Sequence, residues 1–292
     1  MSQSDRVGGM KNIYIIGIGL IGGSLALNIK KLNPNAVIYG IDNNAEHLEE
    51  ALYLNIIDAE AKIDDIVNAD LVVLSIPVDS SVIELPKILD NISDDTLVID
   101  VGSTKTDICN VVANHPKRRN FLATHPISGT EFSGPKAAFL ELFQNKTNII
   151  CEVEKTAFKL QQKAIDLFVN IGMRIRYMNP EAHDKHIAYM SHLSHISSFM
   201  LGKTVIDKEK NERDIFDMAG SGFESTVRLA KSSPEMWTPI FKQNKTNVIE
   251  TLEDYIKNLT QFKELIQRDD FDAVFKEMKN TNHIKQILKG IN

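Results

Sequence analysis

The sequence predicts an α/β fold with a doubly wound, mostly parallel sheet, followed by an all-α C-terminal domain. Short runs of branched aliphatic residues alternate with helical patterns up to Pro180, which is typical of a parallel sheet with helices on both faces. Beyond Pro180 the strand patterns stop and only helical patterns remain. The chain of 292 residues is long enough for two domains. We therefore expect residues 11–179 to form the first domain and residues 180–292 the second.

The individual elements follow from hydrophobic periodicity and from turn residues. The expected strands cover residues 13–16, 37–41, 70–77, 96–100, 121–124, 148–151 and 174–178. The expected helices of the first domain cover residues 45–54, 78–89, 104–112 and 155–170, in addition to one directly after the first strand. Those of the second domain cover residues 181–206, 223–229, 234–268 and 271–288. Residues 1–10 are polar and are expected to be a disordered lead or an added segment, with Met10 as a candidate natural start.

The segment IYIIGIGLIGGSLALNIKK, residues 13–31, is typical of a dinucleotide-binding turn. An apolar strand runs into the spacing Gly17-x-Gly19-x-x-Gly22, and a helical pattern follows. Gly17 permits a tight turn, Gly19 lets the backbone approach a pyrophosphate, and Gly22 lets the helix pack close to the sheet. The free N–H groups at the start of that helix favour phosphate binding. The motif predicts that the first domain is of the Rossmann type.

Asp42 indicates which dinucleotide binds. It ends the second expected strand, where a carboxylate can accept hydrogen bonds from an adenosine ribose. It would repel a 2′-phosphate, and Asn43 and Asn44 supply no cation, so we expect NAD rather than NADP. Asp42 could also cap the next helix, with Asn43 and Asn44 as rival caps. The expected cofactor-binding residues are Gly17, Gly19, Leu20, Ile21, Gly22, Asp42, Ser75 and Pro77.

The composition is typical of a globular protein. The chain is 43% hydrophobic and 25% charged, with a formal net charge of −6, which gives no reason to expect nucleic acid or an anionic membrane as a partner. No apolar run reaches the roughly 20 residues that span a bilayer, and the N-terminus lacks the apolar core of a signal peptide. Cys109 and Cys151 form no C-x-x-C pair. We expect two reduced thiols in a cytoplasmic protein.

Two polar residues are expected at the sheet edge that faces the cofactor. Ser103 follows one strand, and His125 leaves the next in the loop THPISGTE, residues 124–131. In open α/β sheets the carboxyl ends of the strands face the ligand crevice, and a neutral imidazole there can accept a proton. The alternatives are a helix-capping role for Ser103 and a structural role for His125.

Four histidines crowd the first helix of the second domain. His192 and His195 are spaced i,i+3 and share a face. A zinc site would need further ligands and no cysteine lies near, so we expect no metal and interpret this pair as facing the substrate. His183 and His186 are expected to be surface or core histidines.

Two further side chains of the second domain are candidates for a substrate pocket. Arg228 follows a glycine turn, GSGFESTVR, and a guanidinium held on a helix suits bidentate carboxylate binding. Trp237 is the only tryptophan and could form a pocket wall. The alternatives are a solvated arginine and a core tryptophan.

The chain resembles the prephenate dehydrogenase family, which includes arogenate dehydrogenases, in five motifs that follow one another in the same order. They are the glycine turn, VGSTK at 101–105, THPISGTEFSG at 124–134, SHLSH at 191–195 and GSGFESTVRLA at 220–230. The resemblance covers nearly the whole chain from Lys11 onward. It implies a Rossmann domain joined to a helical substrate and dimerisation domain.

The resemblance also implies a reaction and the residues that perform it. Enzymes of this family oxidise prephenate with NAD and release carbon dioxide to give 4-hydroxyphenylpyruvate, a step of tyrosine biosynthesis. His125 matches the family's catalytic histidine and Ser103 the serine that orients it. The substrate-binding residues that it implies are His192, His195, Arg228, Thr130, Glu131 and Trp237.

Some positions depart from the family pattern and leave alternatives open. Ser194 stands where proline is more frequent, and Glu224 and Ser225 stand where arginine and aspartate are more frequent. The second departure removes a cation near the substrate, so the choice between prephenate and arogenate stays open. A homodimer through the C-terminal helices is expected, with a helical cap closed on its own sheet as the alternative.

Two other function classes remain as alternatives. A β-hydroxyacid dehydrogenase also joins a Rossmann domain to a helical one, but it commonly uses a lysine where histidines stand here. A non-catalytic NAD-binding sensor would have no need of His125, Ser103 and Arg228. Turnover of prephenate with NAD would exclude both.

Overall fold

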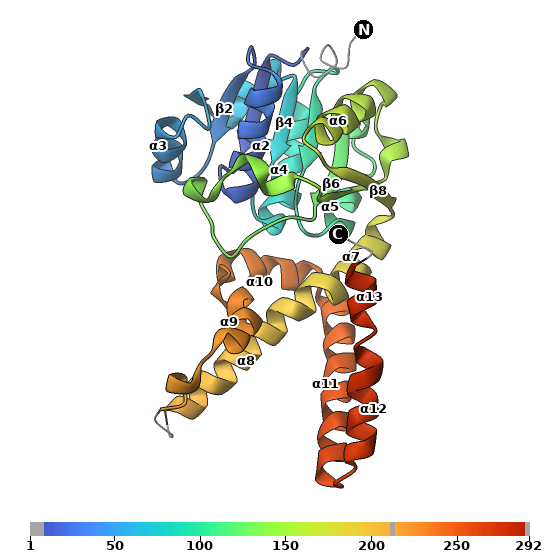
Figure 1. Ribbon diagram of the computed structural model, residues 1–292. Helices are drawn as coiled ribbons and strands as arrows, with labels where there is room; N and C mark the ends of the chain where they lie inside the picture. The colour runs from blue at the N-terminus through green and yellow to red at the C-terminus, as the bar shows by residue number, and fades with distance from the viewer. Residues whose placement is uncertain (1–8, 211–213, 290–292) are drawn as a thin grey trace. The chain divides into compact units, whose positions relative to one another are not determined.

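The computed structural model describes residues 9–210 and 214–289, and its first part is built on one eight-stranded sheet (Figure 1). The strand order is β3-β2-β1-β4-β5-β6-β7-β8. All neighbouring strands are parallel except β6 and β7. The strands are β1 Asn12–Ile16, β2 Val37–Ile41, β3 Ala59–Glu60, β4 Leu71–Leu74, β5 Leu97–Asp100, β6 Phe121–Pro126, β7 Thr147–Cys151 and β8 Arg174–Met178. The predicted doubly wound, mostly parallel sheet is confirmed, and the two-residue strand β3 was not predicted.

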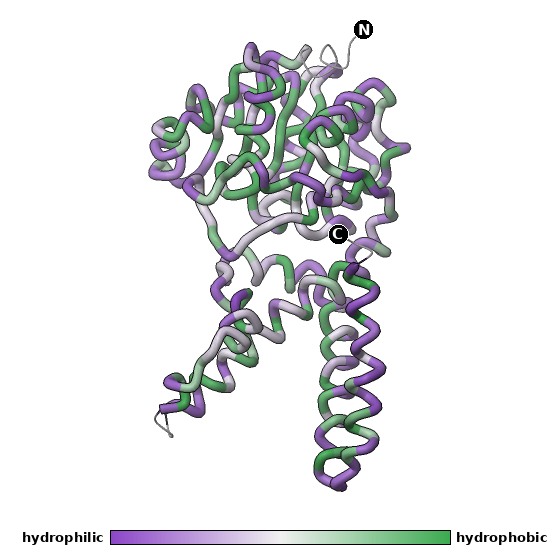
Figure 2. The backbone as a smooth tube through the Cα atoms, in the orientation of Figure 1, coloured by the Kyte–Doolittle hydropathy of each residue, from purple (hydrophilic) through white to green (hydrophobic). Residues whose placement is uncertain are grey.

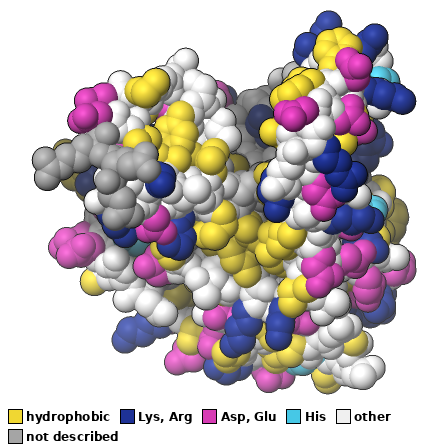
Figure 3. All heavy atoms as spheres, turned by 90° about the horizontal axis from the view of Figure 1, so that it is seen from below, with side chains coloured by type: hydrophobic (Ala, Val, Ile, Leu, Met, Phe, Trp, Pro, Cys, Tyr) yellow, Lys and Arg dark blue, Asp and Glu magenta, His cyan; other side chains and the backbone are white. Residues whose placement is uncertain are grey.

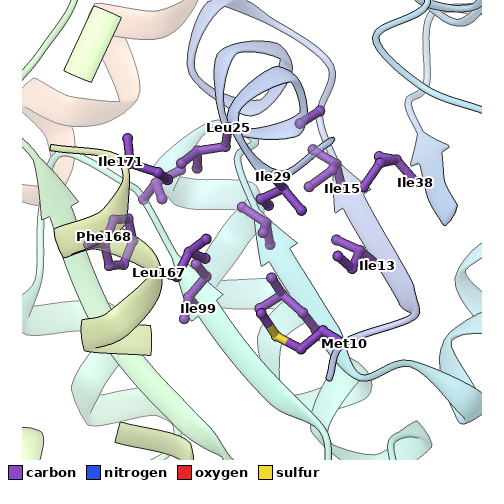
Figure 4. Close-up of a cluster of buried hydrophobic side chains, with 14 of the residues drawn as sticks. Met10, Ile13, Ile15, Leu25, Ile29, Ile38, Ile99, Leu167, Phe168 and Ile171 are labelled. Carbon is purple, nitrogen blue, oxygen red and sulfur yellow. The ribbon is translucent and has the colours of Figure 1, made fainter. Parts of the chain in front are cut away.

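The central strands form because their side chains are buried on both faces. β4 and β5 are buried at every position, as strands covered by helices on both sides must be. On one face, α2 (Leu20–Leu32) and α6 (Phe158–Asn170) contribute to a single apolar cluster (Figure 4). The opposite face is covered by α4 (Val78–Asn91) and α5 (Thr106–Val111). The central strands accordingly appear as hydrophobic stretches of the backbone (Figure 2).

Met10 belongs to this fold. It is 1% exposed in the apolar cluster, and its carbonyl accepts a hydrogen bond from Asn33 Nδ2 at 2.6 Å. The predicted N-terminal lead, residues 1–10, therefore includes a core residue at its end. Its first eight residues lie outside the described residues.

The chain after β8 is helical, as predicted. Its helices are α7 Pro180–Ile187, α8 Leu193–Glu209, α9 Ser221–Val227, α10 Pro234–Gln243, α11 Lys245–Gln267, α12 Phe271–Thr281 and α13 Ile284–Lys289. A π-helical turn, Ala188–His192, joins α7 to α8. Between β2 and β3 lies the helix α3 (Ala45–Tyr53).

Two of the predicted long helices are interrupted. The prediction of one helix over 234–268 is wrong, because Asn244 separates α10 from α11 with φ −98° and ψ 26°. The Asn244 side chain donates to the carbonyl of Asp184 at 2.7 Å, so a tertiary hydrogen bond holds this residue. The predicted helix 271–288 is likewise two helices, since α12 ends at Thr281 and α13 begins at Ile284.

The chain forms two compact units, one up to Lys245 and one from Thr246 onward. The predicted domain boundary between Asn179 and Pro180 lies inside the first unit, where β8 leads into α7. Within that unit α10 packs against α4, and Val78, Trp237 and Ile240 form a small apolar cluster. In the described ranges, no helix has both the length and the apolar character needed to cross a membrane.

Candidate active site

The glycine turn between β1 and α2 has the geometry of a cofactor cradle. Gly17 has φ +91°, and a Cβ there would lie 2.3 Å from the carbonyl oxygen of Ser75. A Cβ on Gly22 would lie 2.1 Å from the carbonyl oxygen of Gly17. A Cβ on Gly19 would meet nothing within 4 Å. The first and third glycines are therefore required by the turn itself, while the second leaves the space above the helix start open to a ligand.

The start of α2 is free to bind an anion. Gly19 is its N-cap and provides no side-chain cap, so the first N–H groups of the helix lack an acceptor within it. Leu20 and Ile21, the first two helical residues, line a cavity beside the turn. This arrangement suits a pyrophosphate.

Asp42 is tied to the glycine turn. Its Oδ2 accepts a hydrogen bond from the Ile18 N–H at 2.9 Å, and its Oδ1 accepts one from the Asn44 N–H at 2.9 Å. The cap of α3 is Asn44, whose side chain accepts from the Glu46 N–H at 3.0 Å. The rival cap Asn44 is thus the actual one. Asp42 stands at the end of β2 with a carboxylate oriented by the turn.

One cavity of about 570 Å³ lies beside this turn, within the first compact unit. Most of the predicted site residues line it, and they come from both the sheet and the helices after β8. They are Gly19, Leu20, Ile21, Ser75, Pro77, Ser103, His125, Thr130, Glu131, His195, Arg228 and Trp237. The predicted residues that do not line it are Gly17, Gly22, Asp42 and His192.

His125 is held by a second histidine that sequence reasoning missed. It lies on β6 and is 8% exposed. Its Nδ1 lies 2.8 Å from Nε2 of His183, and Nδ1 of His183 lies 2.8 Å from Oδ1 of Asp184. Burial, reinforced by His183 and Lys105, lowers the pKa of His125 well below its usual value. The imidazole is therefore neutral at physiological pH.

Asp184 anchors this chain of residues to α5. Its two oxygens accept hydrogen bonds from the backbone N–H groups of Lys105 and Thr106, each at 2.8 Å. Burial raises the pKa of Asp184, but hydrogen bonds from His183 and Thr106 outweigh that effect and hold the pKa below its usual value. The carboxylate is therefore ionised and acts as the cap of α5.

Ser103 lines the cavity instead of capping a helix. Lys105 is the N-cap of α5 and its side chain makes no cap hydrogen bond, so the alternative capping role predicted for Ser103 is taken by Asp184. No hydrogen bond within the described chain engages the Ser103 hydroxyl, which leaves it available to a ligand.

A buried ion pair fixes the end of the strand that carries His125. Lys105 is 0% exposed and its Nζ donates to Oδ2 of Asp100 and to the carbonyl of Thr124, the latter at 2.7 Å. The Thr124 N–H donates to Oδ1 of Asp100 at 3.1 Å, and the Thr124 hydroxyl donates to the backbone carbonyl of Asp100 at 2.6 Å. These contacts join β5, β6 and α5 directly beneath His125.

The predicted histidine pair divides between the cavity and the core. His195 lines the cavity, stacks on Trp237 with ring centroids 3.6 Å apart, and donates from Nδ1 to the carbonyl of Ser191 at 3.0 Å. His192 is 1% exposed and packs edge-on against Trp237. Burial lowers the pKa of His192 to about 4, so it is a neutral core side chain.

Arg228 enters the cavity from the helical part and meets a residue of the loop after β6. Its NH1 lies 2.9 Å from Oε2 of Glu131, and both residues line the cavity. The Arg228 side chain is 49% exposed, so a ligand can reach it. Among the described residues, no three His, Cys, Asp or Glu side chains are grouped to hold a metal ion.

Two profiles of one known protein family match consecutive parts of this chain. Residues 25–177 match the family profile described as prephenate dehydrogenase, nucleotide-binding domain, and residues 179–280 match prephenate dehydrogenase, dimerization domain. The chain belongs to the prephenate dehydrogenase family. The resemblance predicted from the five motifs is confirmed.

Individual members of the prephenate dehydrogenase family cover the chain almost completely. It is 31% identical to a prephenate dehydrogenase of Bacillus subtilis over 280 residues, which are 94% of this chain and 76% of that one. It is 30% identical to a cyclohexadienyl dehydrogenase of Zymomonas mobilis, over 96% of each chain. The crystal structure of an Aquifex aeolicus prephenate dehydrogenase, in complex with hydroxyphenyl propionate and NAD⁺, superposes with a TM-score of 0.84 at 33% identity, covering 96% of this chain and 99% of that one.

Proposed function

We propose that this protein catalyses the NAD-dependent oxidative decarboxylation of prephenate to 4-hydroxyphenylpyruvate in tyrosine biosynthesis. One observation carries the proposal: His125, Ser103, His195 and Arg228 line the same cavity as the open glycine turn. A neutral base, a hydroxyl, a second imidazole and a guanidinium thus surround a space next to a dinucleotide site. These are the groups that a substrate with a ring hydroxyl and two carboxylates requires.

The cofactor site fits NAD. The start of α2 would hold the pyrophosphate, and Asp42 would accept hydrogen bonds from the adenosine ribose hydroxyls. A 2′-phosphate would meet the Asp42 carboxylate. When bound, NAD⁺ accepts a hydride from the carbinol carbon of the substrate.

His125 acts as the general base of this reaction. As the hydride leaves the carbinol carbon, the ring hydroxyl gives its proton to Nε2 of His125. Loss of the ring carboxylate as carbon dioxide returns an electron pair to the ring, which becomes aromatic. The proton then returns to the ring oxygen, so that prephenate and NAD⁺ give 4-hydroxyphenylpyruvate, carbon dioxide and NADH. A general base of this kind contributes about 10²–10⁴-fold in rate.

Ser103, His195 and Arg228 bind and orient the substrate. Arg228 binds a substrate carboxylate through two parallel hydrogen bonds, and Glu131 holds the guanidinium in place at 2.9 Å. His195 uses Nδ1 to donate to Ser191, and its ring lines the cavity beside the substrate. The hydroxyl of Ser103 would orient the substrate hydroxyl toward His125, and Thr130 and Trp237 complete the walls.

The chain acts as a homodimer in the cytoplasm. The match to a family profile described as a dimerization domain supports the homodimer. The exposed apolar side chains of α11, α12 and α13 support their use as the interface. Two buried, unpaired cysteines agree with a reducing compartment.

Arogenate is the second candidate substrate. It carries an amino group where prephenate carries a keto group, and Glu224 and Ser225 on α9 replace the more usual arginine and aspartate. Neither residue lines the cavity, so their effect on the substrate amino group is through charge at a distance, where Glu224 favours an amino group more than a cation would. The similarity to a cyclohexadienyl dehydrogenase also keeps this alternative open.

The test is NADH formation with prephenate and with arogenate, each with NAD⁺ and NADP⁺. We expect turnover of prephenate with NAD⁺, and we expect His125→Asn to keep its NAD⁺ affinity while losing about 10²–10⁴-fold in kcat. Because the pKa of His125 is lowered, its neutral form persists as the pH falls, so kcat/KM should hold down to pH 6.5 and drop only below it. Near-normal turnover by His125→Asn would refute the base assignment. If neither prephenate nor arogenate is turned over, the proposed function is refuted.

A further inference from the structure

We propose that Asp184 and His183 are positioning residues that fix the tautomer of His125, so that its bare Nε2 faces the substrate hydroxyl. This inference rests on the proposed role of His125 as general base and adds two residues to it. Neither residue lines the cavity. They act through His125, from α7, and the contact spans 58 positions of sequence.

The direction of the hydrogen bonds is set at Asp184. Its oxygens already accept from the N–H groups of Lys105 and Thr106, which can only donate. An ionised carboxylate is an acceptor only. His183 must therefore present a protonated Nδ1 to Oδ1 of Asp184, 2.8 Å away.

The protonated Nδ1 of His183 also determines which nitrogen of each imidazole ring donates and which accepts. A neutral imidazole with a protonated Nδ1 has a bare Nε2, so Nε2 of His183 accepts. Its partner at 2.8 Å, Nδ1 of His125, must then donate. The remaining nitrogen of His125, Nε2, is left without a proton. The reverse arrangement would place the lone pair of His183 Nδ1 against the Asp184 carboxylate.

Burial supports the neutral state on which this argument depends. His183 is 2% exposed, and burial lowers its pKa although Asp184 opposes the shift. The charged and titratable groups that act on the two rings are Lys105, Asp100, Asp184 and His192. Lys105 and Asp100 neutralise one another as a buried pair, and His192 is neutral. Asp184 is thus the uncompensated charge of the cluster, and it is placed to stabilise the cation that His125 becomes after it takes a proton.

The free nitrogen of His125 is available to the cavity. No hydrogen bond within the described chain engages His125 Nε2, and it is not among the buried polar atoms that lack a partner. The nitrogen is therefore accessible from the cavity that His125 lines. A carboxylate that orients a catalytic histidine through one ring nitrogen is a general device of triad enzymes, and here a second histidine is inserted between the two.

The first experiment compares His183→Leu, His183→Gln and the control His186→Gln. Leucine removes the acceptor, and we expect kcat with prephenate to fall about 10²-fold, within the range for a general base. Glutamine can accept from Nδ1 of His125 through its amide oxygen, so we expect most of the rate to return. His186 is exposed on the same helix, and its variant should behave as wild type. The NAD⁺ affinity of all three should be unchanged.

The second experiment reads the tautomer in the wild-type enzyme itself and uses folded variants only to assign the signals. Nitrogen-15 spectra of the histidine rings with NAD⁺ bound, assigned with His125→Asn and His183→Gln, distinguish protonated from bare ring nitrogens. We expect a protonated Nδ1 and a bare Nε2 on His125. A protonated Nε2 there would overturn the proposal.

The outcomes separate this inference from the proposed function. An enzyme that turns over prephenate, with His183→Leu as active as His186→Gln, keeps the function and overturns the positioning role. Equal losses in His183→Leu and His183→Gln, with both folded, would also overturn it, because a purely structural role would not be restored by an acceptor. A wild type without turnover refutes the function itself.

Discussion

At the scale of single residues, the site is defined by which ring nitrogens the protein occupies. His125 uses Nδ1 for His183, and His195 uses Nδ1 for the Ser191 carbonyl. In both rings Nε2 is therefore left for a ligand. Two neutral imidazoles from different elements thus line one cavity, each with an unprotonated Nε2. The protein sets their chemistry through the other nitrogen of each ring, by a side-chain contact for His125 and a backbone contact for His195.

The Arg228 guanidinium is placed to determine the affinity for the substrate. Arg228→Ala should raise KM for prephenate about tenfold or more, because a hydrogen bond to a charged group contributes about 1.5–3 kcal/mol. It should change kcat less, since Arg228 binds a carboxylate away from the reacting hydroxyl. Steady-state kinetics measure both constants, with the exposed Arg119→Ala as the control. A fall in kcat at unchanged KM would contradict a binding role.

The residues that sequence reasoning identified are those whose motif has a local signal. His125 and Ser103 each follow a strand that the sequence predicts, although His125 itself lies within β6, and Arg228 follows a glycine turn. His183, Asp184 and Lys105 gave no such signal, because a histidine, an aspartate and a lysine near a helix end are typical of a solvated surface. Their burial depends on partners distant in sequence, which only the folded chain brings together.

At the scale of elements, the π-helical turn Ala188–His192 marks the passage from the sheet to the substrate side. Such turns are rare in proteins, and many of those that occur lie at functional sites. Before it, α7 carries His183 and Asp184 toward the strand edge. After it, α8 carries His195 to the cavity. The sequence predicted one continuous helix over 181–206, since a single inserted residue does not disturb apolar periodicity enough to be recognised.

The buried pair of Lys105 and Asp100 predicts a large effect on stability. Lys105→Met leaves the Asp100 carboxylate buried without its partner, and breaking such a pair costs about 3–5 kcal/mol. We expect a correspondingly lower urea midpoint for the first unit. The same substitution in an exposed pair, Lys87→Met opposite Glu84, should cost at most about 1 kcal/mol.

A double variant identifies the cause of that loss. Asp100→Asn removes the charge while its side-chain oxygen can still accept from the Thr124 N–H. Combined with Lys105→Met, it should recover part of the lost stability. If the double variant is less stable than Lys105→Met alone, the buried charge is not the source of the effect.

The element boundaries that sequence reasoning missed have tertiary causes. β3 consists of Ala59 and Glu60 alone and forms because β2 offers it an edge. Asn244 ends α10 because its side chain is bonded to Asp184. Neither cause is local, whereas the strands with continuous apolar runs, such as β4, were predicted by their own residues.

At the scale of the whole molecule, the cavity is complete within the first compact unit. All of its lining residues precede Lys245. The second unit supplies none of them, yet its three helices α11 to α13 expose many large apolar side chains. They include Ile249, Ile256, Leu259, Ile266, Phe271, Phe275, Met278, Ile284, Ile287 and Leu288, each at least 45% exposed. Hydrophobic side chains also gather in patches on the face of the molecule in Figure 3. Apolar surface of this extent is typical of a protein interface.

The spacing of these side chains predicts how the second unit is used. Ile249 and Ile256 are seven residues apart, and Leu259 and Ile266 repeat the interval, so α11 presents one continuous apolar stripe. We expect the full chain to sediment at twice its mass of 32.8 kDa. Ile256→Glu places a charge in the stripe, which an apolar interface cannot bury without a large cost, and it should shift the protein to monomers. The neighbouring exposed variant Lys257→Glu changes charge outside the stripe and should leave the dimer intact. If the wild type is a monomer at all concentrations, or if both variants sediment equally, the stripe is not the interface of a homodimer.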